Sequence, residues 1–192
     1  MLINESGLVR AVKYAYKHGG YSVVCVGRHM AIYTERWFVR CNREDMPRKV
    51  LGAIAEHAGM IPDDTPVKID KDGEPQMILE DVATDEMDHW TTGNKEKAVT
   101  YAPVIMQGYQ VYQVPEGGVC YGVEMEHLGI VEREAAMDFP ADVIDGDRLL
   151  WKIDDEAVAI DAVRKATAGW AEEWERAVWT ALEGVDLHRA RT

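Results

Sequence analysis

The chain has none of the long apolar segments that cross or enter a membrane. No apolar run in its 192 residues approaches the roughly 20 residues that span a bilayer. The first residues, MLINESGLVR, lack the apolar core of a signal peptide. We therefore expect a cytoplasmic protein without membrane contact. Hydrophobic residues make up 47% of the chain and charged residues 29%, which is typical of a folded protein and argues against extended disorder.

Cysteine is scarce, and short catalytic motifs are missing. Cys25, Cys41 and Cys120 form no CxxC pair. Cys25 and Cys41 lie in expected strands, where a free cysteine behaves as a small buried hydrophobic residue, so we expect all three thiols to be reduced. The sequence has no GxxxxGK[ST] loop, no GxSxG and no HExxH, and we expect no cofactor. A non-enzymatic role is favoured, with an enzyme that lacks a short motif as the alternative.

Charge is unevenly distributed along the chain. Residues 1–50 hold nine Lys/Arg and four Asp/Glu, a net charge of +5, whereas the rest hold twelve and thirty, a net charge of −18. This segregation predicts a basic face beside a strongly acidic one. Basic residues such as Arg28, Arg36 and Arg40 alternate with aromatic ones, a pattern that can bind nucleic acid. The net charge of −18 on the remaining residues repels that polymer, so we expect internal pairing of the basic face with the acidic part and no direct duplex binding.

The stretch Tyr21–Cys41 organises the N-terminal part. Its three apolar runs are separated by two-residue breaks, which predicts three consecutive antiparallel strands. A helical pattern runs from Asn4 to His18 before it, and another follows Pro47 and ends at Gly59. The third strand carries apolar side chains on both faces, which predicts that both are covered. The first sixty residues thus predict an α-β-β-β-α unit.

The remaining residues continue an α+β pattern, with a mainly antiparallel sheet, or two small sheets, and helices packed on the faces. We expect residues 1–79 to form a basic unit ending in a hairpin, residues 80–98 an acidic connection whose first half can be helical, and residues 99–192 an acidic lobe; one continuous domain is the alternative. A sheet-then-helix order recurs roughly in both halves without a fixed period. The expected later elements are a hairpin of 67–69 and 76–79, strands at 99–106, 109–114 and 119–123 with a turn at Glu116-Gly117-Gly118, a helix at 125–137, a hairpin of 148–153 and 157–160, and a helix at 166–183.

Carboxylates concentrate in two stretches, and these supply the candidate partner-binding residues. If both stretches lie on one side, they form an extended negative field that competes for a basic groove. Four side chains of the first stretch, Asp81, Asp85, Asp88 and His89, fall on one helix face, where a divalent cation is an alternative ligand. The candidates are Glu80, Asp81, Asp85, Glu86, Asp88, Asp154, Asp155 and Glu156, with Asp142, Asp145 and Asp147 extending the second stretch.

Histidines and tryptophans offer further candidates with more ordinary explanations. Glu124, Glu126 and His127 can form a catalytic carboxylate–histidine pair, but carboxylates in a first helical turn are explained by the helix dipole, which we favour. His57 follows Glu56, and adjacent residues do not face each other on a helix. In the closing helix the spacing of Trp170 and Trp174 predicts a core-facing side, with Trp179 roughly opposite, either exposed or buried against a partner.

Three segments of the chain carry a resemblance to a known group of proteins. The segments GLVRAVKYAYKHGGYSVV, IYTERWFVRC and PRKVLGAIAEHAG are similar to small accessory proteins carried by phages and prophages of gut bacteria. The resemblance covers about the first third of the chain and includes no diagnostic motif. It implies a context in which inhibitors of bacterial immunity occur, anti-CRISPR proteins among them, some of which present carboxylates where a nuclease expects phosphates.

Three functions follow as hypotheses. The first is a non-enzymatic, phage-encoded inhibitor that binds a basic host protein, such as a defence nuclease, through an acidic, nucleic-acid-mimicking surface. The second is a protein that sequesters a small molecule or nucleotide in a pocket between sheet and helices, lined by tyrosines and arginines. The third is a metal-dependent enzyme without a recognisable motif.

Overall fold

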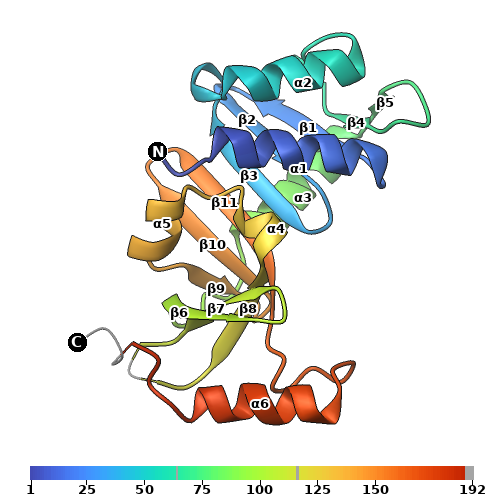
Figure 1. The fold of residues 1–192 in the computed structure, drawn as a ribbon. Helices are drawn as coiled ribbons and strands as arrows, with labels where there is room; N and C mark the ends of the chain where they lie inside the picture. The colour runs from blue at the N-terminus through green and yellow to red at the C-terminus, as the bar shows by residue number, and fades with distance from the viewer. Residues whose placement is uncertain (64, 116, 189–192) are drawn as a thin grey trace.

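The N-terminal unit has the order α1-β1-β2-β3-α2, as predicted from the sequence. Figure 1 shows the computed structural model, which describes residues 1–63, 65–115 and 117–188. Asn4 caps the first helix, because its side-chain Oδ1 accepts the backbone N–H of Gly7 at 2.7 Å. Gly59 ends the last helix of the unit with a φ of 73°. The elements are α1 (Glu5–Lys17), β1 (Tyr21–Val26), β2 (His29–Tyr33), β3 (Trp37–Asn42), a 3-10 turn at Arg43–Asp45 and α2 (Arg48–Ala58).

The strands form one large antiparallel sheet, which confirms the α+β class. Its pairing order is β5-β4-β1-β2-β3-β11-β8-β7-β6, and β10 and β9 extend from the other edge of β11. The further strands are β4 (Val67–Ile69), β5 (Gln76–Met77), β6 (Thr100–Met106), β7 (Tyr109–Gln113), β8 (Cys120–Glu124), β9 (Asp142–Ile144), β10 (Arg148–Ile153) and β11 (Glu156–Val163).

The β3–β11 pair joins the N-terminal strands to the C-terminal ones. Val39 lies opposite Val158, and the pairs Phe38–Ala159 and Arg40–Ala157 flank it symmetrically. Each of the two strands closes an antiparallel meander, β1-β2-β3 or β9-β10-β11. An isolated bridge between Ile3 and Val131 joins the residues that precede the helix of each meander. Each meander therefore follows a helix, and the two meanders are joined edge to edge through β3 and β11.

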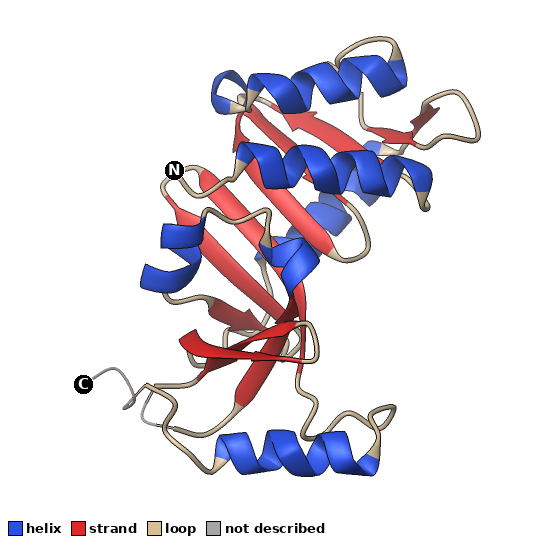
Figure 2. Cartoon of the chain, viewed as in Figure 1, coloured by secondary structure: helices blue, strands red, loops and turns tan. Residues whose placement is uncertain are grey.

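Helices cover both faces of the sheet, as the two-sided pattern of β3 predicts. The remaining helices are α3 (Glu80–Thr91), α4 (Met125–Leu128), α5 (Arg133–Asp138) and α6 (Glu173–Glu183). One face packs against α1, α2, α4 and α5 in the largest hydrophobic cluster, which includes Trp37 and Val39. The other face packs against α3 around Phe38. Figure 2 shows α3 behind the sheet, the other four helices in front of it, and α6 below β6–β8.

Several predicted boundaries differ from the structure because of long-range contacts. The expected helix at 125–137 is split into α4 and α5, since the backbone of Ile130 and Glu132 bonds the N-terminal segment at Asn4 and Leu2. The closing helix begins at Glu173 instead of 166, where Glu172 and Glu175 form a capping box. Residues 142–144 form a strand that the sequence analysis did not predict. The predicted turn at Glu116–Gly118 includes Glu116, which lies outside the described residues.

Candidate functional site: the acidic helix and the adjoining cleft

The helix α3 occupies the segment expected to be an acidic connection, and its inner side explains why it folds there. Ala83 and Trp90 are 1% and 2% exposed and pack on the sheet. The ring of Trp90 stacks on that of Phe38 with centroids 6.4 Å apart, and the guanidinium of Arg148 lies 5.9 Å from its centre. These apolar and cation–π contacts fix the helix on the second face of the sheet.

The solvent-exposed surface of α3 carries the first set of candidate residues. All five carboxylates are exposed to solvent, and no ion pair within the described parts of the chain involves any of them. His89 is exposed beside them. Within the same described residues, no three His, Cys, Asp or Glu side chains are arranged to hold a metal ion. The exposed set is Glu80, Asp81, Asp85, Glu86 and Asp88.

The second set of candidates lies in the β10–β11 turn and is largely neutralised within the molecule. Asp155 accepts the side-chain N–H groups of Asn42 at 3.2 Å and Arg28 at 3.1 Å. The hydrogen bond from Asn42, followed by the charge of Arg28, lowers the pKa of Asp155. Glu156 accepts the backbone N–H of Leu2. Asp154 is exposed and has a φ of 51°. Of these three carboxylates, only that of Asp154 projects into solvent with no such partner among the residues that the structure describes.

The residues expected to extend the second stretch are also paired. Asp142 bonds Lys95 at 2.7 Å, and Asp145 and Asp147 both contact the guanidinium of Arg148 at 2.6 and 3.3 Å. Arg28 with Asp155, and Arg36 with Glu124, pair the basic N-terminal part with the acidic C-terminal part. The two acidic stretches therefore differ in kind, because α3 presents free charge and the residues around β9–β11 present mostly paired charge.

A second candidate region lies where β11 changes partner. One edge of β11 pairs with β3 as far as Ile160 and then with β8 from Ala162, so that Asp161 stands at the junction. The end of β8 and the β2–β3 turn meet there. Glu124 contacts Arg36 at 3.7 Å, accepts the Tyr109 hydroxyl at 3.4 Å and lies 3.4 Å from Nδ1 of His127. Glu124 thus takes part in a long-range polar cluster, and the helix dipole of the four-residue α4 is not needed to explain its position.

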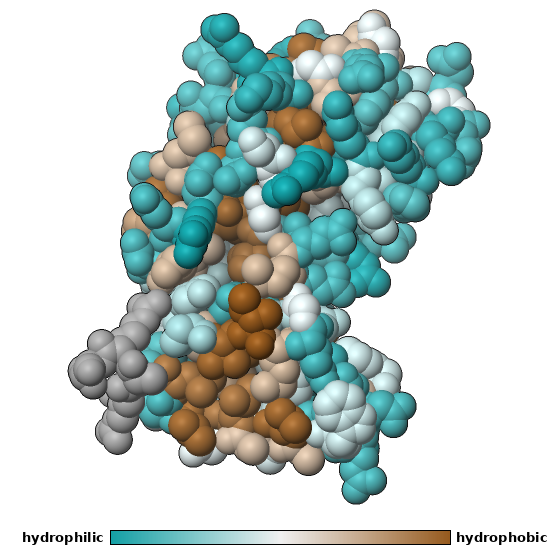
Figure 3. All heavy atoms as spheres, in the orientation of Figure 1, coloured by the Kyte–Doolittle hydropathy of each residue, from teal (hydrophilic) through white to brown (hydrophobic). Residues whose placement is uncertain are grey.

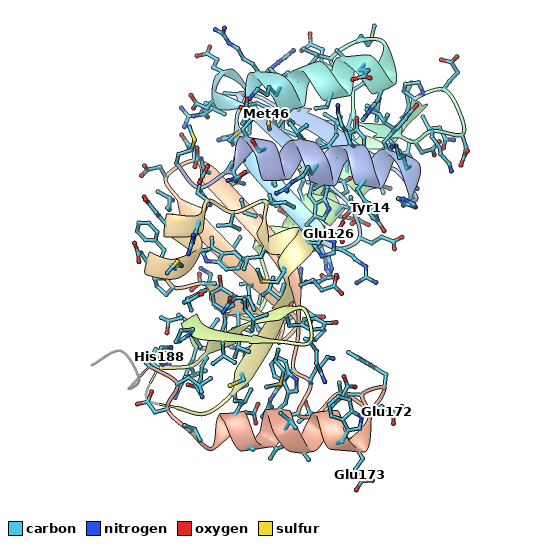
Figure 4. The ribbon with its side chains drawn as sticks, viewed as in Figure 1. Tyr14, Met46, Glu126, Glu172, Glu173 and His188 are labelled. Atoms are coloured by element: carbon cyan, nitrogen blue, oxygen red, sulfur yellow. The ribbon has the colours of Figure 1, made fainter. Side chains whose placement is uncertain are left out.

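Three hollows surround this cluster and share its residues. A cavity of about 160 Å³ at the junction is lined by Arg36, Glu124, His127 and Asp161. A cleft of about 520 Å³ also reaches Arg36 and His127 and extends past Tyr33 to α3. A hollow of about 240 Å³ lies between α1 and α4, where Figure 4 shows Tyr14 and Glu126 on neighbouring elements. A pocket lined by aromatic and basic side chains between sheet and helices is therefore present.

Burial shifts the ionisation of two groups at the junction. Burial, and secondarily the negative charge of Asp147, raises the pKa of Asp161 to about 6. Burial also lowers the pKa of His127, although Glu124 opposes this shift, so the neutral imidazole is favoured near pH 7. Shifted groups in a cavity are the usual features of a ligand site. Sequence reasoning could not find Asp161 or Tyr109, because only long-range pairing brings them to His127.

His57, the remaining candidate histidine, and the three cysteines make packing contacts within the fold. His57 stacks on Tyr16 with ring centroids 3.9 Å apart, and its Nδ1 lies 3.0 Å from the Tyr21 hydroxyl. Cys25, Cys41 and Cys120 are buried and form no disulfide. Burial raises the pKa of the Cys41 and Cys120 thiols to about 12, which disfavours the nucleophilic thiolate.

The tryptophan prediction for the closing helix is wrong. Trp170 and Trp174 are 65% and 61% exposed, whereas Trp179 is fully buried against β6–β8. The helix begins later than expected, and the Gly122 backbone leaves room for Trp179, since a Cβ at that glycine would stand 2.7 Å from the indole ring. Figure 3 shows apolar side chains gathered over this lower part of the molecule, whereas the part that carries α1 and α2 is mostly hydrophilic.

No protein-family model and no curated protein matches the chain. Among the described residues, no helix is long and apolar enough to cross a membrane.

Proposed function

We propose that this chain is a non-enzymatic inhibitor that binds a basic host protein in the bacterial cytoplasm. The outer face of α3 occupies a groove that normally receives nucleic acid, and a phage-encoded inhibitor of a defence nuclease is the form of this function that we favour. The observation that carries the proposal is the set of five exposed carboxylates on α3, of which Glu86 borders the cleft. None is in an ion pair within the described residues, and the helix packs on the sheet.

Unpaired charge on α3 suits this role for two physical reasons. A carboxylate already paired inside the molecule, such as Asp155, contributes little to an external field, whereas the α3 carboxylates remain available to a partner's Lys and Arg side chains. The total charge of −13 adds long-range attraction to a basic protein and repulsion from nucleic acid. We accordingly narrow the proposed binding surface to α3, with Asp154 as the one candidate of the β10–β11 turn that is free to contribute.

The test compares two variants with the same change in net charge. The first replaces the α3 carboxylates with amides: Glu80→Gln, Asp81→Asn, Asp85→Asn, Glu86→Gln and Asp88→Asn. The matched control replaces five exposed carboxylates on other elements: Glu44→Gln, Glu56→Gln, Glu134→Gln, Asp138→Asn and Glu173→Gln. Partners captured from a host lysate are identified by mass spectrometry, purified, and their association rates with each variant are measured at low and high salt.

We expect the α3 variant to associate more slowly than the parent at low salt and to show a flatter salt dependence. The control variant should associate at nearly the parent's rate, because salt screening limits the effect of an exposed charge to groups close to it. A DNA oligonucleotide should compete with the chain for the same partner. If the two variants slow association equally, net charge alone acts and α3 is not the binding surface.

The 520 Å³ cleft favours a second candidate function, the binding of a small molecule or nucleotide. Its lining combines Arg36 and His127 with the aromatic side chains of Tyr14 and Tyr33. A thermal-shift screen with nucleotides and divalent ions tests this function, because a ligand that binds only the folded state raises its melting temperature. A ligand that still raises the melting temperature of the Arg36→Ala and Tyr14→Ala variants binds outside this cleft.

A further inference from the structure

Three large apolar side chains project into solvent at the entry to α3. Met77 at the end of β5 is 81% exposed, Leu79 just before the helix is 71% exposed, and Val82 in its first turn is 45% exposed. We call Met77, Leu79 and Val82 the entry patch. It is interleaved in the chain with Glu80 and Asp81, so apolar surface and free carboxylates share one segment. Apolar residues at the centre and charges at the rim are the usual composition of a protein–protein interface.

Leu79 occupies a position where leucine is unfavourable. It is the N-cap residue of α3, and its side chain makes no capping hydrogen bond. Ser, Asp or Asn there would accept an unpaired backbone N–H of the first turn, and leucine is among the poorest residues for this role. Leu79 also gains no burial that would offset the loss. A local preference broken without a structural benefit is typical of a residue kept for function.

The entry patch continues into the cleft described above. Leu79, Val82 and Glu86 follow helical spacing, so they lie along one side of α3. Val82 and Glu86 line the 520 Å³ cleft together with Ile78 and Tyr33. An apolar side chain of a partner that contacts Leu79 can therefore extend past Val82 towards Ile78 and Tyr33. The same cleft is also lined by Glu35 and Glu86 and by the basic side chains of Arg36 and Lys68.

We infer that the entry patch and the adjoining cleft bind a protein segment in which Lys or Arg residues flank a large apolar side chain. The inference rests on the proposed function and specifies its partner: the basic residues face the α3 carboxylates, and the apolar side chain covers Leu79 and Val82. Charge complementarity favours this occupant over a second copy of the chain, because two copies would bring two sets of α3 carboxylates together. Nucleic acid is excluded by the same repulsion.

The test uses two fluorescently labelled decapeptides, one of lysine only and one with leucine at every third position among lysines. Fluorescence anisotropy gives the affinity of each for the parent, for the double variant Leu79→Ser/Val82→Ser, for the five-amide α3 variant and for the control Met60→Ser, an equally exposed methionine on another loop. Sedimentation velocity of the parent reports self-association, and thermal melting confirms that each variant folds.

We expect the leucine-containing peptide to bind the parent about tenfold more tightly than the lysine peptide, since burial of one leucine contributes at least this factor. The double variant should bind the two peptides equally, and Met60→Ser should behave as the parent. Equal affinity of the parent for both peptides, or self-association abolished by the double variant, would overturn the inference and leave the acidic surface intact. If neither peptide binds the parent, or if the α3 variant binds as well as the parent, the proposed function itself fails.

Discussion

The burial of single side chains decides how the tryptophans contribute to stability. Trp37 is 3% exposed and packs in the largest hydrophobic cluster, whereas Trp174 is 61% exposed on α6. We expect Trp37→Ala to lower the free energy of unfolding by about 3–5 kcal/mol, because it removes a large buried side chain and leaves a cavity. Trp174→Ala should change it by no more than about 0.5 kcal/mol. Urea denaturation of the two variants measures both values, and a large loss in Trp174→Ala would show that α6 packs differently.

A single carboxyl at the junction should make stability depend on pH. The pKa of Asp161 is raised to about 6 by burial and by Asp147, so the folded chain holds this proton more tightly than the unfolded chain. The contribution of Asp161 to stability is then fully present below the unfolded pKa near 4 and is lost as the pH rises through about 6. Arg36 and Arg148 oppose this shift, and Glu124 adds to it.

We therefore expect Asp161→Asn to gain stability relative to the parent as the pH rises from 4.5 to 7.5. The amide cannot ionise, so the variant avoids the cost of a buried charge at the higher pH. Urea denaturation of parent and variant at both pH values measures the difference in their free energies of unfolding. Asp138→Asn, on an exposed carboxylate, serves as the control. A constant difference between parent and Asp161→Asn at both pH values would contradict the raised pKa.

At the scale of the helix, the N-terminus of α3 lacks a side chain that caps it. Leu79→Ser supplies the missing capping group, and we expect it to raise the free energy of unfolding by roughly 0.5–1 kcal/mol. The same substitution should weaken the binding of a partner that covers the entry patch. Thermal melting of Leu79→Ser beside Leu79→Ala separates the cap from the loss of the apolar side chain, because alanine cannot cap. A destabilised Leu79→Ser would mean that Leu79 has a structural role.

The positions where helices begin and end depend on contacts as well as on helical periodicity. The residues between α4 and α5 are bonded to the chain's N-terminus, which interrupts a pattern that otherwise favours one helix. The start of α6 is marked by the capping box of Glu172 and Glu175. Glu175 is also held by the buried ammonium of Lys165 at 2.9 Å, which lies over the rings of Tyr109 and Trp170. Helical periodicity alone could not locate either boundary.

At the scale of the whole molecule, β11 ties the chain together. It pairs with β3, β8 and β10, and the largest hydrophobic cluster includes residues from Leu2 to Ala162. We expect a single cooperative unfolding transition, because neither meander can lose β11 pairing without exposing the shared core. Coincident denaturation curves from tryptophan fluorescence and far-UV circular dichroism would confirm it.

A matched pair of variants tests whether unfolding is a single cooperative transition. Val158→Asp places a charge in the fully buried β3–β11 pair and should lower the midpoints of both signals together, whereas Lys152→Asp, on an exposed residue of β10, should lower neither by much. Two separated transitions in the parent would show that residues 1–79 and 99–192 fold as independent units.

The sequence alone determined the local elements whose signals are short in range. The alternation in Tyr21–Cys41 gave three strands, Asn4 and Gly59 marked helix ends, and the two-sided apolar pattern of β3 predicted cover on both faces. The concentration of carboxylates between residues 80 and 88 was also evident, because charge is a property of composition.

Tertiary structure decided which of these side chains are exposed, which are paired and which lie together. Asp155 and Asp81 look alike in the sequence, but Arg28 and Asn42 reach only the first, across more than a hundred residues. Trp174, expected to face the core, is exposed, and Trp179 is buried within the chain, because the packing of α6 on β6–β8 selects its buried side. The cluster of Arg36, Tyr109, Glu124, His127 and Asp161 exists only because β11 changes partner there. Periodicity and composition describe neighbours along the chain, whereas burial and charge pairing depend on neighbours in space.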